Sequence, residues 1–505
     1  MREPSLIDAV VPLLTLAVLI GGALLLFGLD ALDGPIQVAL VVCAMVAGLV
    51  ALRLGHTWEE VQAAAQASMA SITSAIFILL AVGALIGVWN LSGTIPTLVY
   101  YGIQILSPGW YYGATALICG LVALSIGSSW TTAGTIGVGL VGIAVALGVS
   151  PAVTAGAVVS GAYLGDKLSP LSETTVLSSQ MVGVDVHEHI RRQAWTSVPA
   201  FGLAMVGFVI LGLVRGVDNV VPTSVELSAL DGVYNITPLN LLPLVLLAGM
   251  SIRKVPASLA LMAATLFAGV TGAILQPDVV QGFVEGRGGP VVQSIKAVWQ
   301  AAATGFHADS GIGEIDRLVS RGGMSSMLLT VWLIIGAVTF GALLQEFGLI
   351  SRLVDPLISA AKTTGRLFAT VFACAFGLNL VAGDQYIALV LPTKVFRAEF
   401  ARRGLAPTNL SRLAADSGTV TSPLVPWNSC GAFMAAVLGV ATIRYLPYAF
   451  FCIASPLLSV AYGAIGFRIE RVEPVEPPEG VRPSVNPIDP AATPTSDLDQ
   501  ARERP

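Results

Sequence analysis

Charged side chains are scarce in this sequence. Only 11% of its 505 residues are Asp, Glu, Lys or Arg, and 55% are hydrophobic, whereas a soluble globular protein carries about 25% charged residues. This scarcity excludes a large soluble domain, and apolar runs long enough to cross a bilayer recur along the chain. Barrel strands would instead give short alternating runs. The sequence therefore predicts an all-α, polytopic helical membrane protein.

Cysteine motifs and the signatures of common enzymes are also absent. The five cysteines stand singly in apolar runs, which argues against a disulfide framework or a zinc site. The chain has no His-Glu-x-x-His motif and no Gly-x-Ser-x-Gly motif. The segment Leu164-Gly-Asp166 lacks the Tyr-Asp partner that an intramembrane aspartyl protease needs. We therefore expect no enzymatic activity, no cofactor and no nucleic-acid partner.

Two polar segments interrupt the apolar runs. The first is Gly165-Asp-Lys-Leu-Ser-Pro-Leu-Ser-Glu-Thr-Thr175, and the second is Asp416-Ser-Gly-Thr-Val-Thr-Ser-Pro-Leu-Val-Pro-Trp-Asn428. The prolines in Ser169-Pro170 and Ser422-Pro423 remove a backbone donor from a helix. Polar, helix-breaking sequence at matching places in two halves of a membrane protein is typical of a transporter's binding site. Both segments are therefore predicted to be breaks within transmembrane helices.

An internal repeat surrounds these segments. Asp416 follows Gly377 at the same separation at which Asp166 follows Gly127. The stretch 91–110 has no Lys or Arg, whereas its counterpart 349–366 has three. Because positively charged loops stay on the cytoplasmic side, the two copies are predicted to be inverted. Each copy would hold a hairpin and a broken helix. Whether the hairpins are re-entrant or full spans stays open.

These features divide the chain into six segments, with both termini expected in the cytoplasm. The stretch beyond Arg471 is rich in proline and has no aromatic residue, which predicts a disordered tail. The predicted segments are N-terminal transmembrane helices at 1–70, inverted repeat 1 at 71–194, linking transmembrane helices with an outer loop at 195–325, inverted repeat 2 at 326–443, a last transmembrane helix at 444–471 and the tail at 472–505.

Intramembrane carboxylates are costly and are functional candidates by default. Asp166 and Asp416 occupy matching positions, and Asp384 lies in the second hairpin. A carboxylate that must release its proton to accept a cation couples the two ions through one site. Asp166 could instead form a structural ion pair with Lys167, and that alternative stays open. The histidines of His187-Glu-His189 are predicted to lie on a solvated helix face.

The motifs resemble those of the NhaC family of sodium/proton antiporters. The resemblance rests on Gly161-Ala-Tyr-Leu-Gly-Asp-Lys-Leu-Ser-Pro-Leu-Ser-Glu-Thr-Thr175 and on Asp416-Ser-Gly, Thr421-Ser-Pro-Leu and Pro426-Trp-Asn428. It implies inverted repeats with two hairpins and two broken helices. It also implies exchange of sodium for protons, although some similar proteins exchange organic acids or take up amino acids.

We therefore expect a sodium/proton antiporter of the cell membrane, with lipid, sodium ions and protons as its partners. A homodimer is compatible with the sequence. The alternative is a sodium- or proton-coupled carrier of a small organic acid or an amino acid. Asp166, Asp416 and Asp384 are the expected proton and cation carboxylates, with Na+ at Asp166 and Asp416. The further polar candidates are Lys167, Ser169, Ser172, Thr174, Ser129, Thr132, Asn379, Ser422 and Asn428.

Overall fold

The computed structural model describes residues 2–215, 223–284, 289–308, 316 and 319–474. Over these residues the chain is helical, and Leu405 and Arg471 form an isolated β-bridge. Eight helices are long and apolar enough to cross a membrane, and a ninth span arises if one bent pair is counted as a single span. The prediction of an all-α polytopic membrane protein is confirmed.

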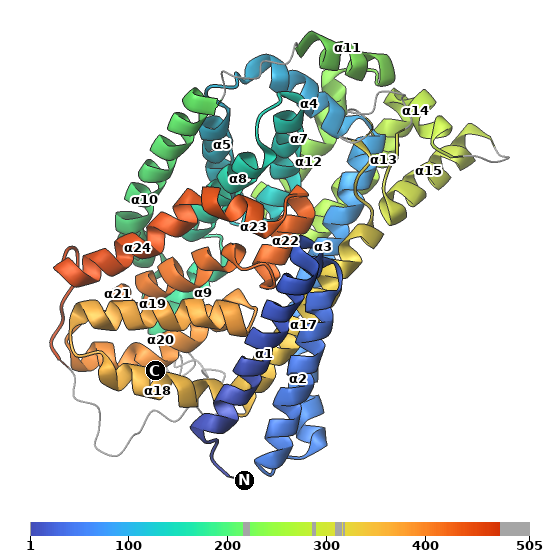
Figure 1. Ribbon diagram of the computed structural model, residues 1–505. Coiled ribbons are helices and arrows are strands. Elements are labelled where there is room, and N and C mark those ends of the chain that lie inside the picture. Colours follow the sequence, from blue (N-terminus) through green and yellow to red (C-terminus); the bar gives the residue numbers. More distant parts are fainter. Residues whose placement is uncertain (1, 216–222, 285–288, 309–315, 317–318, 475–505) are drawn as a thin grey trace, which may run out of the picture.

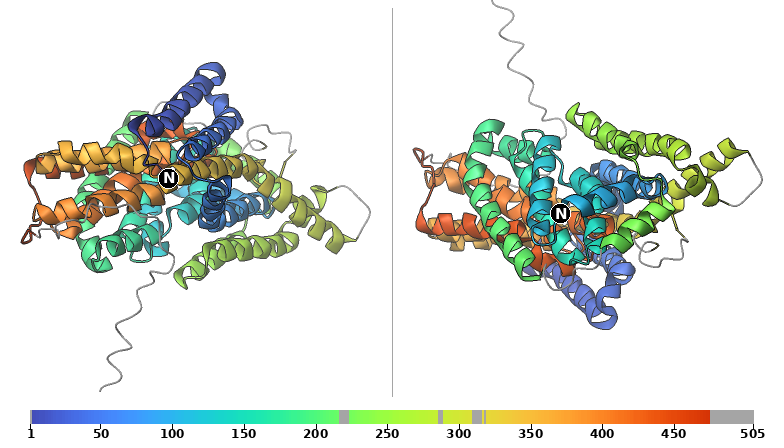
Figure 2. Two further views of the ribbon diagram at one scale, coloured as in Figure 1. Left: turned by 90° about the horizontal axis from the view of Figure 1, so that it is seen from below. Right: turned by 90° about the horizontal axis from the view of Figure 1, so that it is seen from above.

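The N-terminal helices form a hairpin that stands out from one face of the molecule (Figures 1 and 2). Its first helix starts with a capping box, in which Ser5 and Asp8 bond each other's backbone N–H groups. The hairpin packs on α17 through its second helix. The elements are α1 (Leu6–Phe27), η1 (Gly28–Asp33) and α2 (Pro35–Arg53).

The first half of the molecule runs from a long helix through a hairpin to a broken helix. The hairpin is formed by α5 and the continuous run α6–η2–α7, and the broken helix by α8 and α9. The elements are α3 (Trp58–Leu91), α4 (Thr94–Ile105), α5 (Tyr111–Ile126), α6 (Ser129–Thr132), η2 (Ala133–Gly137), α7 (Val138–Ala146), α8 (Pro151–Leu168), α9 (Glu173–Val182) and α10 (Val186–Arg215).

A linking region packs along α3 and projects beyond the rest of the molecule with α14 and α15, at the right in Figures 1 and 2. It follows α10 and precedes the second half. Its elements are α11 (Thr223–Val233), η3 (Pro238–Leu241), α12 (Leu242–Ile252), α13 (Ala257–Leu275), α14 (Pro277–Gly282) and α15 (Pro290–Thr304).

The second half repeats the order of the first, with a long helix, an amphipathic helix, a hairpin and a broken helix. Its elements are η4 (Met324–Met327), α17 (Leu328–Glu346), α18 (Leu349–Ala360), α19 (Thr364–Val381), α20 (Gln385–Arg402), α21 (Pro407–Ala414), η5 (Ala415–Thr419), η6 (Ser422–Leu424), α22 (Ser429–Leu438), α23 (Thr442–Tyr445), η7 (Leu446–Tyr448) and α24 (Phe450–Ile465).

The two amphipathic helices α4 and α18 occupy stretches that the charge argument treated as loops. Each follows a glycine in the left-handed region, Gly93 with φ 74° and Gly348 with φ 69°. A side chain would strain this conformation, so glycine allows the sharp turn after the long helix. In Figure 1, α4 lies at the upper end of the molecule and α18 at the lower end.

Close packing of α5 on α8 fixes the first broken helix in place. A Cβ atom added at Gly161 would lie 2.2 Å from the carbonyl oxygen of Ala116. One added at Gly165 would lie 2.4 Å from the backbone nitrogen of Leu124. Two glycines one turn apart thus let the helix backbones approach closely, as small residues do between membrane helices.

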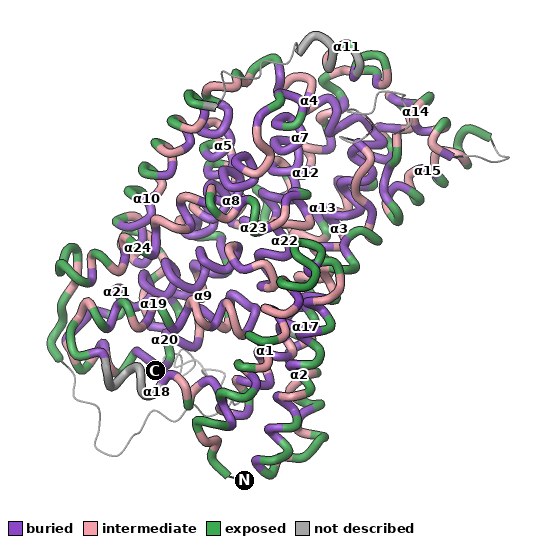
Figure 3. Tube along the Cα trace, viewed as in Figure 1, coloured by how far each residue is buried: buried purple, intermediate pink, exposed green. Residues whose placement is uncertain are grey.

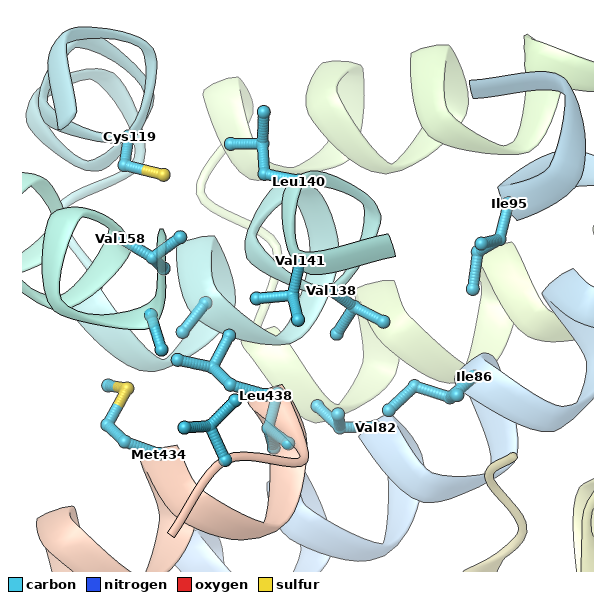
Figure 4. Close-up of a cluster of buried hydrophobic side chains, with 14 of the residues drawn as sticks. Val82, Ile86, Ile95, Cys119, Val138, Leu140, Val141, Val158, Met434 and Leu438 are labelled. Atoms are coloured by element: carbon cyan, nitrogen blue, oxygen red, sulfur yellow. The ribbon is translucent and has the colours of Figure 1, made fainter. Parts of the chain in front are cut away.

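The interior between the halves is buried (Figure 3), and part of it is a cluster of apolar side chains. In Figure 4, Leu438 of α22 lies close to Val138 and Val141 of α7, and Val82 of α3 lies beside them. All of these side chains are buried. The hairpin of the first half and the broken helix of the second therefore share one hydrophobic core.

The chain after α24 is described as far as residue 474, and the remainder of the predicted tail lies outside the described residues. Its first residues are extended and lie against the segment between α20 and α21. The backbone N–H of Val472 donates to the carbonyl of Gly404 over 2.9 Å.

Candidate functional site

Both hairpins turn inside the protein, each against the break in the broken helix of its own half. Gly127 lies at the first tip, where an added Cβ would be 2.6 Å from Leu171 in the first break. Gly383 lies at the second tip, and its carbonyl accepts the N–H of Ser429 over 2.8 Å just after the second break. Both glycines are buried and have positive φ values. In each half, the hairpin tip therefore meets the helix break inside the protein.

Asp166 lies at the first of these junctions, with 5% of its surface exposed. Helix α8 ends two residues later because the proline of Ser169-Pro170 interrupts it, and Ser172 caps the start of α9. Asp166 Oδ1 accepts the Ser172 hydroxyl over 2.5 Å, and Oδ2 accepts the Ser129 hydroxyl from the hairpin tip over 2.8 Å. Ser172 Oγ is also 3.0 Å from Thr174 Oγ1.

This arrangement offers hard oxygen ligands. A hydroxyl that now donates to a carboxylate can rotate and present a lone pair instead. Carboxylate and hydroxyl oxygens around one buried position suit a hard cation such as Na+ better than a soft metal. Across the described part of the chain, no three His, Cys, Asp or Glu side chains gather as a metal centre would require.

Lys167, the next residue, is paired with Asp416 from the second half. Its Nζ donates to Asp416 Oδ1 and, over 2.8 Å, to Ser455 Oγ of α24. Gln193 Nε2 of α10 and Ser455 Oγ donate to the same carboxylate oxygen, each over 2.7 Å. Lys167 also lies 5.3 Å from the ring centroid of Phe451. Four elements therefore meet at one buried ion pair.

This ion pair bears on the alternative that Asp166 pairs with Lys167. Lys167 forms an interhelical pair, but with Asp416 and not with Asp166. Both side chains are almost fully inaccessible, at 1% and 0% exposed. Consecutive helical residues point about 100° apart, so Asp166 and Lys167 face different neighbours. Asp166 and Asp416 consequently belong to two adjacent polar clusters and do not face a common position.

Asp384 has a local role in the structure. It caps α20, with Oδ1 accepting the backbone N–H groups of Tyr386 over 2.8 Å and Ile387 over 3.1 Å. It is 7% exposed and follows Gly383 at the buried hairpin tip. The corresponding cap in the first hairpin is Ser128, which caps α6 in the same way.

The second break has its own amide cluster. Asn379 Nδ2 donates to the carbonyl of Gly418 over 2.7 Å and to Thr421 Oγ1 over 2.9 Å. Asn428 Nδ2 donates to Asn379 Oδ1 over 3.0 Å. Ser422 Oγ donates to the carbonyl of Thr419 over 2.7 Å. The amide groups of Asn379 and Asn428 thus hydrogen-bond to each other, and Asn379 also bonds the backbone of the break.

The side chains of two further candidates bond to backbone groups of their own segment. Thr132 Oγ1 donates to the carbonyl of Ser128 over 2.9 Å. Ser169 Oγ accepts the N–H of Leu171 over 3.3 Å within the break. Neither is joined to a carboxylate by these bonds.

Three contributors were missed from the sequence. Gln193 follows the basic start of α10 and Ser455 stands in the apolar helix α24, and nothing in the local pattern of either shows that it faces Asp416. Tyr386 donates to Glu173 over 2.9 Å and so joins the second hairpin to α9. A tyrosine directly after an intramembrane Asp-Gln pair was the available signal for this contact.

The prediction for His187-Glu-His189 is only half right. His187 is 81% exposed, but His189 is fully buried, with Nδ1 lying 2.9 Å from Ser411 Oγ. The reason is helical geometry, since α10 packs on α21 with the face that carries residue 189.

Comparison with known proteins agrees with this architecture. The profile of the Na+/H+ antiporter family matches residues 6–216 and 192–467. The chain is 38% identical to a Na(+)/H(+) antiporter NhaC of Alkalihalophilus pseudofirmus, over 86% of this chain and 91% of that relative.

Two other relatives carry different substrate names. One is an arginine/ornithine antiporter of Halobacterium salinarum, 34% identical over 95% of this chain and 96% of the relative. The other is a malate-2H(+)/Na(+)-lactate antiporter of Bacillus subtilis, 33% identical over 86% of this chain and 90% of the relative. All three relatives are named as antiporters and none as an enzyme. By its family profile and the extent of these matches, the chain belongs to the Na+/H+ antiporter family.

Proposed function

We propose that this multi-pass membrane protein exchanges Na+ for H+ across the cell membrane, with Asp166 as the cation-binding carboxylate. One observation carries the proposal: a buried Asp166 gathers hydroxyls from the hairpin tip and from the helix break. The oxygens of Ser129, Ser172 and Thr174 complete the candidate set of ligands. Broken helices in membrane proteins are tolerated where they line such a site.

The exchange follows from competition for one carboxylate. A proton or a sodium ion neutralises Asp166, and each must leave before the other binds. An uncompensated carboxylate in a buried site costs several kcal/mol, so the empty, ionised site is disfavoured during the crossing. The ammonium of Lys167 on the next residue repels a second cation. Asp416, Asp384 and the amide cluster of Asn379 and Asn428 then act as supporting groups.

We propose further that 71–194 and 326–443 are inverted repeats, which would let the site open to either side in turn. The repeated element order and the placement of α4 and α18 at opposite ends support this. For the flanking segments we propose the boundaries expected from the sequence, at 1–70, 195–325, 444–471 and 472–505.

The basic residues support an orientation with both termini in the cytoplasm. Arg403 Nη2 donates to the carbonyl of Ala361, and Arg192 pairs with Glu470 over 2.6 Å. These contacts bring the ends of α18, α20 and α24 and the start of α10 to one side of the molecule. Clustered Lys and Arg mark the cytoplasmic side.

A carrier of small organic acids or amino acids is the second candidate function, because relatives bear such names. One observation disfavours an organic anion. The ammonium of Lys167, which would have to hold its carboxylate, is already engaged by Asp416 and Ser455.

A homodimer would need an exposed apolar face, and α15 offers one. Val291, Ile295 and Trp299 on this helix are 71%, 57% and 76% exposed. We propose this face for a second copy or for lipid. The mass of the purified protein in detergent, measured by light scattering, decides between one copy and two.

The test uses purified protein in liposomes with a preformed pH gradient and an internal pH dye. We expect NaCl to collapse the gradient, and malate, lactate, arginine and ornithine to have no effect at equal concentration. An organic solute that collapses the gradient while NaCl does not would overturn the proposal. Asp166→Asn is the control, because it keeps the size of the side chain but cannot exchange a proton for a cation.

A further inference from the structure

A buried polar column runs between α10 and α21 and leads to the Lys167–Asp416 pair. His189 and Gln193 stand one turn apart on α10, and both are fully buried. His189 contacts Ser411 on α21, and Gln193 donates to Asp416. The column thus has His189 at one end and the ion pair at the other.

The outer end of the column reaches the protein surface at the start of α10. Asp185 Oδ1 accepts the backbone N–H groups of His187 and Glu188 there. His187 is 81% exposed, so only the first turn of α10 separates His189 from water. Glu470 lies at the same end and bonds Arg192 over 2.6 Å and Thr408 over 3.0 Å.

Several buried polar atoms in the column lack a partner within the described protein. They are His189 Nε2, Gln193 Oε1, Arg412 Nε, Arg412 Nη2 and Asp416 Oδ2. A buried polar group without a hydrogen bond costs about 1–3 kcal/mol, so such groups are rare and call for an explanation. Close packing of side chains alone does not account for five such atoms in one column.

The charges around His189 come from every side of the column. Lys167 of α8 and Asp416 of η5 act on it electrostatically. Arg412 of α21 lies near both Lys167 and Asp416. Arg192 and Glu470 form the ion pair nearer the surface. An imidazole in this position faces groups of both signs, and imidazole is the side chain most used to shuttle protons near neutral pH.

We propose that His189 carries the protons that reach or leave the Lys167–Asp416 pair, which lies one residue along α8 from Asp166, from the side where α10 begins. Nε2 accepts a proton to form the imidazolium and later gives the same proton up again, so each passage ends with the neutral ring with which it began. Ser411 orients the ring through Nδ1 and leaves Nε2 free. His189 is therefore a positioning and proton-carrying residue, and it takes no part in holding Na+. This role rests on the proposed exchange of Na+ for H+.

The test compares two kinds of exchange in proteoliposomes. His189→Gln keeps a polar side chain beside Ser411 but cannot carry a proton. We expect it to slow Na+-driven proton flux by about a hundredfold, the contribution of a well-placed proton-transfer group. Exchange of radioactive Na+ for unlabelled Na+ moves no proton, and we expect it to stay unchanged. The matched control is His187→Gln, on the same helix turn but exposed.

Each outcome decides the role of His189. Loss of both kinds of exchange would show a structural role and overturn the proposal. Retention of both would overturn it as well. Ser411→Ala is a second test, because it keeps the imidazole of His189 but removes its hydrogen-bond partner. We expect this variant to show slower proton flux with unchanged sodium exchange. Na+-driven proton flux is first measured on the unaltered protein. If that protein moves no protons with Na+, the proposed function fails, and this result is distinct from any effect of the His189 variants.

Discussion

At the scale of single residues, the hydroxyl groups around Asp166 are expected to set the affinity for the cation. Ser172 donates to Asp166 over 2.5 Å, and a hydrogen bond to a charged group contributes about 1.5–3 kcal/mol. Ser172→Ala should therefore weaken the apparent sodium affinity by about tenfold or more. Asp166→Asn should abolish the exchange.

The measurement is the sodium dependence of proton flux in liposomes. Ser178→Ala is a matched control, because Ser178 is also buried on α9 but its hydroxyl donates to the carbonyl of Thr174. An unchanged sodium dependence in Ser172→Ala would remove this residue from the site.

The Lys167–Asp416 pair makes a prediction about stability. Removing one partner of a buried ion pair leaves a charge without compensation and costs about 3–5 kcal/mol. Lys167→Met should therefore lower the melting temperature in detergent strongly. The double variant Lys167→Met/Asp416→Leu should melt at a higher temperature than Lys167→Met alone. A double variant less stable than the single one would show that the pair is not the main interaction of Lys167.

At the scale of helices, the contact between α5 and α8 depends on two glycines. Gly165→Ala would place a methyl group 2.4 Å from the backbone nitrogen of Leu124, so the helices must separate. Overpacking of this kind costs about 1–3 kcal/mol. The control is Gly202→Ala on α10, where an added Cβ meets nothing within 4 Å. Thermal unfolding in detergent should show a lower melting temperature for Gly165→Ala and no change for Gly202→Ala.

The sequence predicted the broken helices well because their cause is local. The proline of Ser169-Pro170 and the caps at Ser172 and Asn428 act within a few residues, and the structure has breaks at both places. The partners of the two carboxylates, in contrast, do not follow from the local sequence. Asp166 and Asp416 match in sequence, yet only Asp416 meets Lys167, since α10 and α24 bring Gln193 and Ser455 to that side alone. Such pairing depends on packing that no motif records.

At the scale of the whole molecule, the proposed inversion predicts opposite accessibility for equivalent positions. Ser107 follows α4 and Lys362 follows α18, and both are exposed. All five native cysteines are buried. In intact cells, a membrane-impermeant maleimide should therefore label Ser107→Cys but not Lys362→Cys. Lys362→Cys should react only after the membrane is opened, and equal labelling of both in intact cells would contradict the inversion.

The junction at Lys167 has a mechanical consequence. It joins α8, α10, η5 and α24 to one another, so in the proposed exchange we expect these elements to move together. The movement would then occur at contacts that are not held by buried polar bonds. The apolar contact of α7 and α22 with Val82 of α3 (Figure 4) is one such surface. A shift at this apolar contact would break no hydrogen bond, so we expect the movement to occur where α7 and α22 meet α3.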